Sequence, residues 1–411
     1  MTEWIGAAEA ADRLGIKPAS LYAYVSRGVL TRRREPDGRA SMFDADEVAA
    51  LARKGRPRRA PGGSELIIES ALTELTESSL HYRGLDATEL ARHRSFEDVA
   101  KLLWSGSLPD DGGAGMPRSQ PNWQSTAEAL AAGTAAQAAL PPGTLPLERL
   151  QVIVPALAAT DQFRLHLDPP AVMAAGQAMI AGMAGALPSS QRPDERTEQG
   201  PIALRLAGRL CAGPMPAGLP DVLSVALVLL ADHELAASTL AARVAASMRA
   251  DPYAVVATGL GAMGGALHGG AALGAELMLG SAAEPADVPR VVGDLLRRGE
   301  RLPGFGHFVY KGGDPRANLL LEVVTDFAAD SARLAVASAV TAEVRRRALP
   351  EPNIEFALAV LGDVAGMIRG AGEAIFAIAR TAGWLAHALE EYERNIPIRP
   401  RSVYTGHSAD A

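Results

Sequence analysis

The sequence predicts an all-α protein built from a small basic N-terminal module and a larger helical body. The chain has 411 residues, which exceeds the usual size of one domain, so two or more folding units are expected. From residue 65 onward, apolar residues recur at helical spacing with almost no strand signal. Residues 1–60 hold 12 Lys and Arg against 8 Asp and Glu, whereas the whole chain carries a net charge of −7. A basic head on an acidic body indicates two separate roles.

The overall composition is typical of a globular protein with a sizeable core, because 48% of the residues are hydrophobic and 21% are charged. Cys211 is the only cysteine, which excludes an intramolecular disulfide and fits a reducing cytosol. We expect Cys211 to pack as a small buried apolar side chain rather than to act as a nucleophile. No apolar run reaches membrane-spanning length, and the N-terminus lacks a signal-peptide pattern. We therefore expect a soluble, cytoplasmic protein with no membrane partner.

Two short helices are expected at the start of the module. Residues 6–14 (GAAEAADRL) predict a helix with its apolar side chains on one face. A tight turn follows at residues 15–17. Pro18 suits the first position of a second helix, over residues 19–27, and Gly28 would cap its end.

A basic hairpin and a third helix complete the module. Asp37 and Gly38 are a hairpin signal between basic segments. Asp44 would cap a third helix over residues 45–54. The order of helix, turn, second helix and basic wing resembles the winged helix-turn-helix head of excisionase and MerR-type proteins.

That resemblance implies that residues 1–54 form a winged helix-turn-helix domain, with its second helix near the DNA groove and its wing near phosphates. The side chains implied in DNA contact are Ser20, Tyr22, Tyr24, Arg27, Arg32, Arg33 and Arg34. One copy would bind weakly, so pairing in a dimer would be required. The alternative is a degenerate head that only packs or mediates assembly. Residues 55–65 are a linker by composition, and their arginines are either solvated or add phosphate contacts.

Helical periodicity continues through the body, as residues 96–104, 222–231 and 382–389 illustrate. Stretches rich in Pro, Gly and Ser at residues 106–122 and 188–201 are expected to be loops. No fixed-period repeat, Walker motif or dinucleotide-binding fingerprint occurs in the sequence.

Three short histidine motifs within some seventy-five residues carry the chemistry: residues 232–239 (DHELAAST), 265–271 (GALHGGA) and 303–307 (PGFGH), the last running on to residue 317. Glycine beside a histidine removes Cβ bulk, so a ligand can reach the ring and the adjacent backbone N–H groups. With an arginine following the last motif, the pattern predicts a pocket for a small, multiply charged anion. A satisfied core histidine is the structural alternative for each. The histidines are not paired with Cys or carboxylates at ligand spacing, so no metal is implied.

Residues 66–411 resemble the citrate synthase family, through the three histidine motifs and several others in the same order along the chain. The other motifs lie at residues 81–84, 89–91, 96–100, 352–356, 379–387 and 399–406. The resemblance implies an all-helical obligate dimer, with a large domain over residues 66–270 and 360–411 and a small domain over residues 271–359.

The resemblance also implies a reaction, the condensation of an acyl-CoA with an α-keto acid through an enol of the thioester. That chemistry needs a carboxylate base and a donor to the thioester carbonyl. By the family's pattern Glu355 is the base, His268 is the enol donor, and His307 polarises the keto carbonyl. The implied keto-acid ligands are His233, Arg316, Arg380 and, from the partner subunit, Arg399; Lys311 would lie near the CoA phosphates.

Arginine suits a dicarboxylate because its planar fork pairs bidentately with a carboxylate and stays charged. A surface ion pair is the structural alternative for any single arginine. The remaining histidines, His81, His93, His166, His387 and His407, are expected to be structural or exposed.

The chain departs from the family's pattern at three positions. Glu355 stands where the base is normally Asp, Ala272 where Asn usually follows the second histidine motif, and Phe308 where Arg often follows the third. One extra methylene moves a carboxylate by about 1 Å, and a misplacement of that size can cost about a hundredfold in rate.

The leading hypothesis is a cytoplasmic homodimeric citrate synthase-type enzyme that condenses acetyl-CoA with oxaloacetate and needs no cofactor, because acetyl-CoA is itself a substrate. One alternative is a 2-methylcitrate synthase that uses propionyl-CoA. Another is a DNA-binding regulator whose body senses oxaloacetate, citrate or an acyl-CoA, with domain closure around the ligand as the switch.

Overall fold

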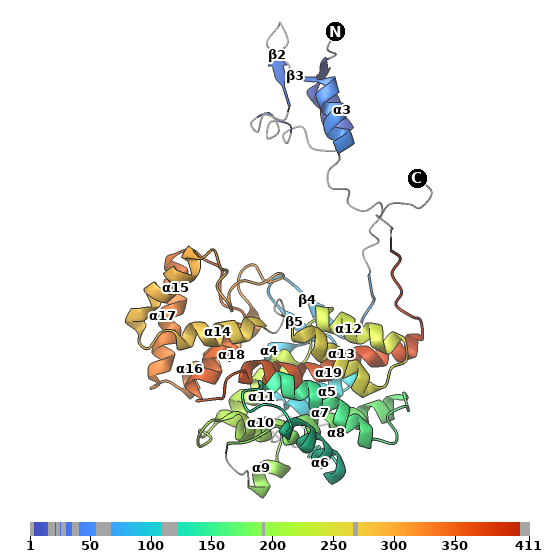
Figure 1. Ribbon diagram of the computed structural model, residues 1–411, viewed down its shortest axis with the longest axis vertical. Coiled ribbons are helices and arrows are strands. Elements are labelled where there is room, and N and C mark those ends of the chain that lie inside the picture. The colour runs from blue at the N-terminus through green and yellow to red at the C-terminus, as the bar shows by residue number, and fades with distance from the viewer. Residues whose placement is uncertain are drawn as a thin grey trace. The chain divides into compact units, whose positions relative to one another are not determined.

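The computed structural model describes residues 4–14, 21, 25, 30–34, 41–54, 67–108, 122–190, 194–265 and 270–402. The chain divides into two compact units, an N-terminal head and a body over residues 69–399, and each is described by itself (Figure 1). No helix in the described ranges combines the length and the apolar character that a membrane crossing needs.

In the part of the head that the structure describes, a three-stranded antiparallel sheet lies beside helices α1 (Ala7–Leu14) and α3 (Ala45–Lys54). Its strands pair in the order β1-β3-β2. In chain order the described elements are β1 (Trp4–Gly6), α1 (Ala7–Leu14), β2 (Arg32–Arg34), β3 (Ser41–Asp44) and α3 (Ala45–Lys54). Apolar side chains between sheet and helices form a small separate core, which includes Leu21, Phe43 and Val48.

The predicted first and third helices of the head are confirmed, and so is the cap of the third. Asp44 Oδ1 accepts hydrogen bonds from the backbone N–H groups of Asp46 (2.9 Å) and Glu47 (3.2 Å). Arg34 pairs with Ser41 in the sheet, so β2 and β3 flank the predicted hairpin turn. The turn itself, and most of the predicted second helix with Ser20, Tyr22, Tyr24 and Arg27, lie outside the described residues.

The body begins with a small antiparallel sheet that the sequence did not predict. Its strands are β4 (Thr73–Leu75), β5 (Leu80–Tyr82) and β6 (Leu85–Asp86), paired in that order. The strands have two or three residues each, which is too short for an alternating pattern to stand out. Leu80 and Tyr82 nevertheless face the core, where both are fully buried.

The rest of the body is helical, as predicted. Its first helices, up to the turn that carries His233, are α4 (Ala87–His93), α5 (Phe96–Ser105), α6 (Ala127–Ala138), α7 (Pro146–Thr160), α8 (Pro169–Ala186), α9 (Glu195–Gln199), α10 (Ile202–Leu210) and α11 (Leu219–Leu230). The expectation of a loop throughout residues 188–201 is wrong at α9, which Asp194 caps through a 2.8 Å hydrogen bond from the Thr197 N–H.

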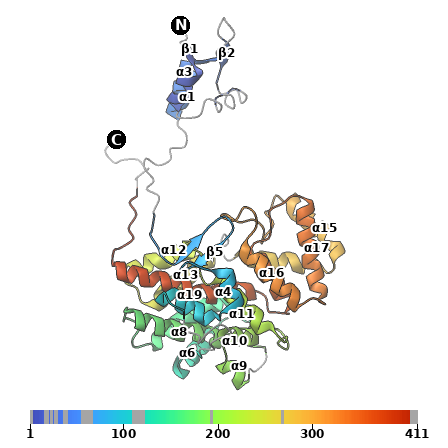
Figure 2. The ribbon, with the colours of Figure 1, turned by 180° about the vertical axis from the view of Figure 1, so that it is seen from behind.

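The later helices are α12 (Ala237–Ser247), α13 (Pro252–Met263), α14 (Gly270–Gly280), α15 (Val288–Arg297), α16 (Pro315–Phe327), α17 (Ala332–Arg346), α18 (Ile354–Val364) and α19 (Ala371–Arg394), with a 3₁₀ turn at Pro285–Asp287. In both ribbon views α14 to α18 form one group beside the remaining helices (Figures 1 and 2). Within this group α14 packs on α18, α16 on α18, and α15 on α17.

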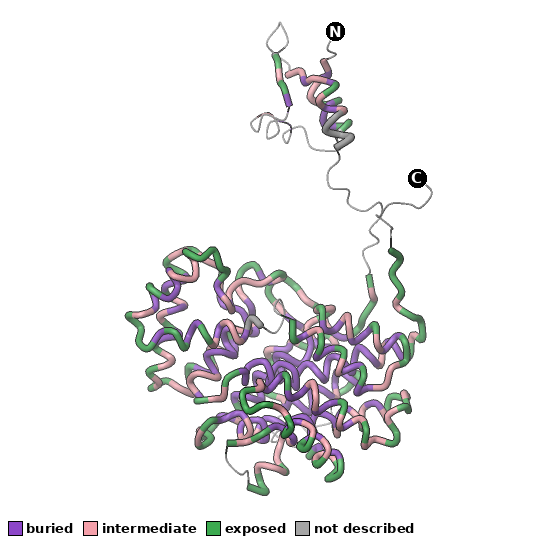
Figure 3. Tube along the Cα trace, viewed as in Figure 1, coloured by how far each residue is buried: buried purple, intermediate pink, exposed green. Residues whose placement is uncertain are grey.

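Helix α19 runs through the centre of the body and is buried on nearly all sides (Figure 3). It packs against α5, α7, α8, α11, α12 and α13. A helix that is covered all round is typical of a protein core rather than of a surface. The buried polar side chains of α19 must therefore find their partners inside the protein.

Candidate active site

The loop over residues 303–307 is docked onto the start of α18. The backbone N–H of Gly306 donates to the carbonyl of Glu351 (2.8 Å), and that of Asn353 donates to the carbonyl of Gly304 (2.9 Å). The side-chain amide of Asn353 also donates to the carbonyl of Gly306 (2.9 Å). Both glycines have positive φ, and a Cβ at Gly304 would lie 2.8 Å from Cβ of Phe356. Glycine is therefore required for this close approach.

His307 follows this loop, and its Nδ1 accepts hydrogen bonds from the backbone N–H groups of Val309 (3.0 Å) and Tyr310 (3.2 Å). A ring nitrogen that accepts has no proton, so the proton of the neutral ring lies on Nε2. Burial, with Arg316 nearby, lowers the pKa of His307 to about 4. At neutral pH His307 is therefore an uncharged donor through Nε2–H, the form that can polarise a carbonyl oxygen.

His233 lies in the turn after α11 and reaches the same place. Its Nε2 is 3.1 Å from the hydroxyl of Tyr310, and its ring centroid is 5.3 Å from that of His307. Burial lowers the pKa of His233 well below its usual value, and Arg316 and Arg380 lower it further. The two histidines thus meet as uncharged rings in a positively charged environment.

Arg316 lies in the first turn of α16, where it forms a bidentate ion pair with Asp314. Its Nε and Nη2 donate to the two carboxylate oxygens at 3.0 and 2.8 Å, and both side chains are buried. Asp314 also caps α16 and accepts from the backbone N–H of Ile354 at 3.2 Å. Asp314 therefore joins the starts of α16 and α18 and fixes Arg316 beside the histidines.

Glu355 lies in the first turn of α18, which Asn353 caps. Its Oε2 is buried and has no hydrogen-bond partner among the described residues. Burial raises the pKa of Glu355, while Arg316 and Arg380 act in the opposite direction. A carboxylate oxygen that is shielded from water and accepts no hydrogen bond is a stronger base than a solvated one once the group is ionised, which suits proton abstraction from carbon.

Arg380 approaches from α19. Its Nε donates to the carbonyl of Leu230 at 2.9 Å, whereas its buried Nη2 has no hydrogen-bond partner among the described residues. Burial lowers its pKa, which Asp232 and Glu355 partly offset. A buried guanidinium with an unpaired N–H group is suited to bind an anionic ligand.

The structure thus brings together five of the predicted site residues: His233, His307, Arg316, Glu355 and Arg380. Lys311 is exposed nearby, with Nζ 3.4 Å from the carbonyl of His307. Arg399 is exposed beyond the end of α19, and His268 lies outside the described residues. Within the described ranges, no group of His, Cys, Asp and Glu side chains is arranged to hold a metal ion.

Sequence reasoning did not single out Tyr310, which contacts three of the predicted residues. Besides its hydroxyl contact with His233, its ring stacks on His307 with centroids 4.6 Å apart, and Arg316 lies 5.7 Å from its centroid. Burial raises the pKa of Tyr310 to about 12, so the hydroxyl keeps its proton at neutral pH. The signal was its position three residues after His307, the histidine of the third motif.

Comparisons with known proteins identify what this chain is similar to. A family model described as the C-terminal domain of citrate synthase matches residues 64–401, so the head lies outside the match. Citrate synthase 2 of Bacillus subtilis is 31% identical over 82% of this chain and 93% of its own length. A 2-methylcitrate synthase of Mycobacterium tuberculosis is 31% identical over 80% of this chain and 85% of its own. The crystal structure of citrate synthase from Thermotoga maritima superposes with a TM-score of 0.67 and 28% identity, covering 84% of this chain and 94% of that one.

Proposed function

The chain belongs to the citrate synthase family, and we propose that its site condenses acetyl-CoA with oxaloacetate to give citrate and free CoA. It is an enzyme of the citrate synthase type, and acetyl-CoA acts as a substrate, so no resident cofactor is required. The observation that best supports the reaction is the meeting of an uncharged His307 donor with two buried arginines and with Glu355, whose Oε2 is shielded from water.

In this proposal the keto acid binds first to the positive side of the site. Arg316 and Arg380 pair with its carboxylates, and His233 adds a hydrogen bond. The Nε2–H of His307 donates to the keto oxygen, where negative charge develops during addition. Because this donor is already held in place, little reorganisation is needed in the transition state.

Glu355 then removes a proton from the methyl group of acetyl-CoA, and His268 is the proposed donor to the thioester oxygen. The resulting enol carbon bonds to the keto carbon, and the keto oxygen gains a proton. Water hydrolyses the citryl thioester, which breaks the carbon–sulfur bond and releases the CoA thiol. Glu355 is one methylene longer than the aspartate of the family's pattern. The position of the first turn of α18 must therefore compensate for the extra length and place the carboxylate at the methyl group of acetyl-CoA.

A 2-methylcitrate synthase activity with propionyl-CoA is the alternative within the family, since a relative of that name matches about as well as the citrate synthases. The two activities share the site chemistry and differ only in the space available for one methyl group. A direct comparison of kcat/KM for the two acyl donors separates them.

We also propose the dimer and domain arrangement of the family for this chain. In this arrangement residues 271–359 would form the small domain, a proposal that the packing among α14 to α18 supports, and residues 66–270 and 360–411 would form the large one. Arg399, exposed in one subunit, would reach the partner's site, and Lys311 would meet the CoA phosphates. The cytoplasmic location expected from the single cysteine stays a prediction.

For the head we propose a winged helix-turn-helix that contacts DNA. The three-stranded sheet beside helices α1 and α3 supports this proposal, as does the exposure of Arg33 on β2. In a regulator of this kind, oxaloacetate or an acyl-CoA would alter DNA affinity while turnover stays negligible. A gel-shift assay with random-sequence duplexes, with and without oxaloacetate, tests this second function.

A thiol-release assay tests the enzymatic function. Purified protein should release CoA thiol from acetyl-CoA only when oxaloacetate is present, and the Glu355→Gln variant should lose most of this release. No release from either acetyl- or propionyl-CoA at high protein concentration would exclude the enzymatic proposal and leave the regulator.

A further inference from the structure

The turn at residues 230–233 runs alongside α19 and forms hydrogen bonds with successive turns of that helix. Arg380 Nε donates to the carbonyl of Leu230 at 2.9 Å. One turn of α19 later, the backbone N–H of Gly383 donates to the carbonyl of Ala231 at 3.0 Å. The fit is tight, because a Cβ at position 383 would lie 2.5 Å from that carbonyl oxygen. These two contacts fix where the turn lies on the helix.

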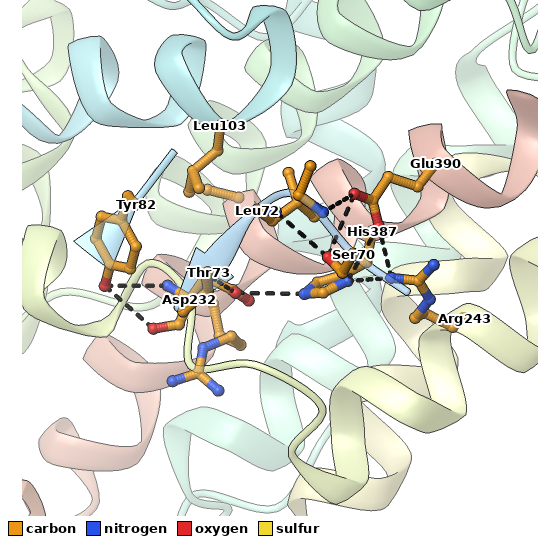
Figure 4. A network of polar contacts seen from close by, with 12 residues as sticks. Ser70, Leu72, Thr73, Tyr82, Leu103, Asp232, Arg243, His387 and Glu390 are labelled. Carbon is orange, nitrogen blue, oxygen red and sulfur yellow. Dashed lines mark hydrogen bonds and ion pairs between the residues drawn. The ribbon is translucent and has the colours of Figure 1, made fainter. Parts of the chain in front are cut away.

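The third contact in this series is between side chains, as Figure 4 shows. His387, one further turn along α19, places its Nε2 3.3 Å from Oδ2 of Asp232. Its Nδ1 lies 2.6 Å from Nη1 of Arg243, on α12. Arginine has no acceptor, so Arg243 donates to Nδ1, and the proton of His387 must lie on Nε2 and point to Asp232. All three side chains are almost completely buried.

Arg243 is itself held by two carboxylates of α19. Its Nη1 donates to Glu390 at 2.7 Å and its Nε donates to Glu391 at 2.6 Å. On the other side, the hydroxyl of Thr73 on β4 donates to Oδ2 of Asp232. Asp232 Oδ2 therefore accepts from both His387 and Thr73, and it cannot rotate without breaking both hydrogen bonds.

These hydrogen bonds keep the carboxylate of Asp232 from turning to form an ion pair with the guanidinium of Arg380. The two groups are near enough for Asp232 to offset the burial of Arg380, yet the Nη2 of Arg380 has no hydrogen-bond partner among the described residues. Oδ1 of Asp232 is likewise buried without one. A carboxylate free to turn would be expected to pair bidentately with the guanidinium and consume the donor that an anionic substrate needs.

We propose that Arg243, His387 and Asp232 form a positioning relay for the keto-acid site, which sets the turn that carries His233 and keeps Nη2 of Arg380 available for a substrate carboxylate. None of the three residues of the relay need touch the substrate. This proposal rests on the proposed function, because it assigns the relay to the oxaloacetate half of that reaction.

The test compares two replacements of His387. His387→Gln retains an amide N–H in the direction of Asp232, whereas His387→Leu has similar bulk and no donor. The Leu variant should raise KM for oxaloacetate about tenfold or more, the size expected when a hydrogen bond to a charged group is lost. KM for acetyl-CoA should change less than about twofold, and the Gln variant should recover most of the loss.

A milder pair covers the case in which His387→Leu does not fold. Thr73→Val removes the second hydrogen bond to Asp232. Its matched control is Thr381→Val, on buried α19, where the hydroxyl lies against the helix carbonyl of Ala377 and the sulfur of Met183. The first should raise KM for oxaloacetate, and the second should not.

A purely structural role would lower kcat, through loss of active protein, without a selective change in KM for oxaloacetate. That result, or equal effects of Leu and Gln at position 387, would overturn the relay. If the wild-type protein releases no thiol, the proposed reaction fails. The relay is then tested by measuring the Kd for oxaloacetate of the same variants by calorimetric titration. Absence of oxaloacetate binding to the wild type would then overturn both.

Discussion

The two sides of the site hold their functional groups by different means. On the loop side, residues 303–316 and the first turn of α18 are joined mainly by backbone hydrogen bonds and by two glycines with positive φ. On the helix side, residues 230–233 are held to α19 by buried polar side chains together with one backbone hydrogen bond, from Gly383 to Ala231. The comparison indicates that the loop side reaches a fixed geometry largely through contacts between segments close in the sequence, whereas the helix side depends on buried polar side chains that join segments far apart in the sequence.

The largest expected effect lies on the loop side, at the reacting carboxylate. Glu355→Gln removes the base and preserves the shape, so kcat should fall by about a thousandfold, within the range for general-base catalysis. KM for oxaloacetate should change little. The rate of CoA thiol release measures both parameters.

Glu351→Gln is the matched control for this change, because Glu351 lies four residues earlier and its side chain pairs with Arg345 rather than with the site. Its activity should be close to that of the wild type. If Glu355→Gln turns over as fast as the control, the base lies elsewhere.

The next effect tests how the loop side reaches its geometry. Gly304→Ala adds a Cβ that would lie 2.8 Å from Cβ of Phe356, at a φ of 81°. The loop must shift, and a displacement of about 1 Å at His307 can lower kcat/KM about a hundredfold. Gly261→Ala is the control, since nothing lies within 4 Å of a Cβ there. Equal activity of the two variants would show that the docking of the loop does not set His307.

These two sides also differ in how far the sequence predicts them. The third histidine motif identified His307 and the following Arg316, because these two residues are close in the sequence and also lie close together in the fold. The arrangement of Asp232, His387 and Arg243 joins residues more than 140 positions apart. No local pattern encodes such a contact, and His387 was therefore expected to be structural or exposed.

The small sheet at the start of the body was missed for a related reason. Strands of two or three residues carry too few positions for a period of two to be recognised. The long helices were predicted because apolar residues at helical spacing over many positions indicate which face of the helix is buried, as at residues 96–104 and 222–231.

The pH dependence of the rate tests the protonation states of Glu355 and His307, the two titratable groups proposed to act on the loop side. The base must be ionised, so kcat/KM for acetyl-CoA should fall as pH drops through the raised pKa of Glu355, by about tenfold per pH unit below it. His307 stays uncharged down to about pH 4, where its own pKa lies, and adds no second proton above that pH. The acid limb of the kcat/KM profile should therefore have the slope of one proton. A two-proton slope above pH 5 would contradict the uncharged state of His307.

The smallest expected effect lies where the two sides meet, at the hydroxyl of Tyr310, 3.1 Å from Nε2 of His233. Tyr310→Phe keeps the ring stacked on His307 and removes one hydrogen bond, so KM for oxaloacetate should rise only about three- to tenfold. Tyr392→Phe is a suitable control, because that hydroxyl donates to the carbonyl of Ala250 instead. If the two sides act independently, combining Tyr310→Phe with His387→Leu should multiply their effects on KM. A combined effect smaller than the product would show that Tyr310 and the relay position the same histidine, His233.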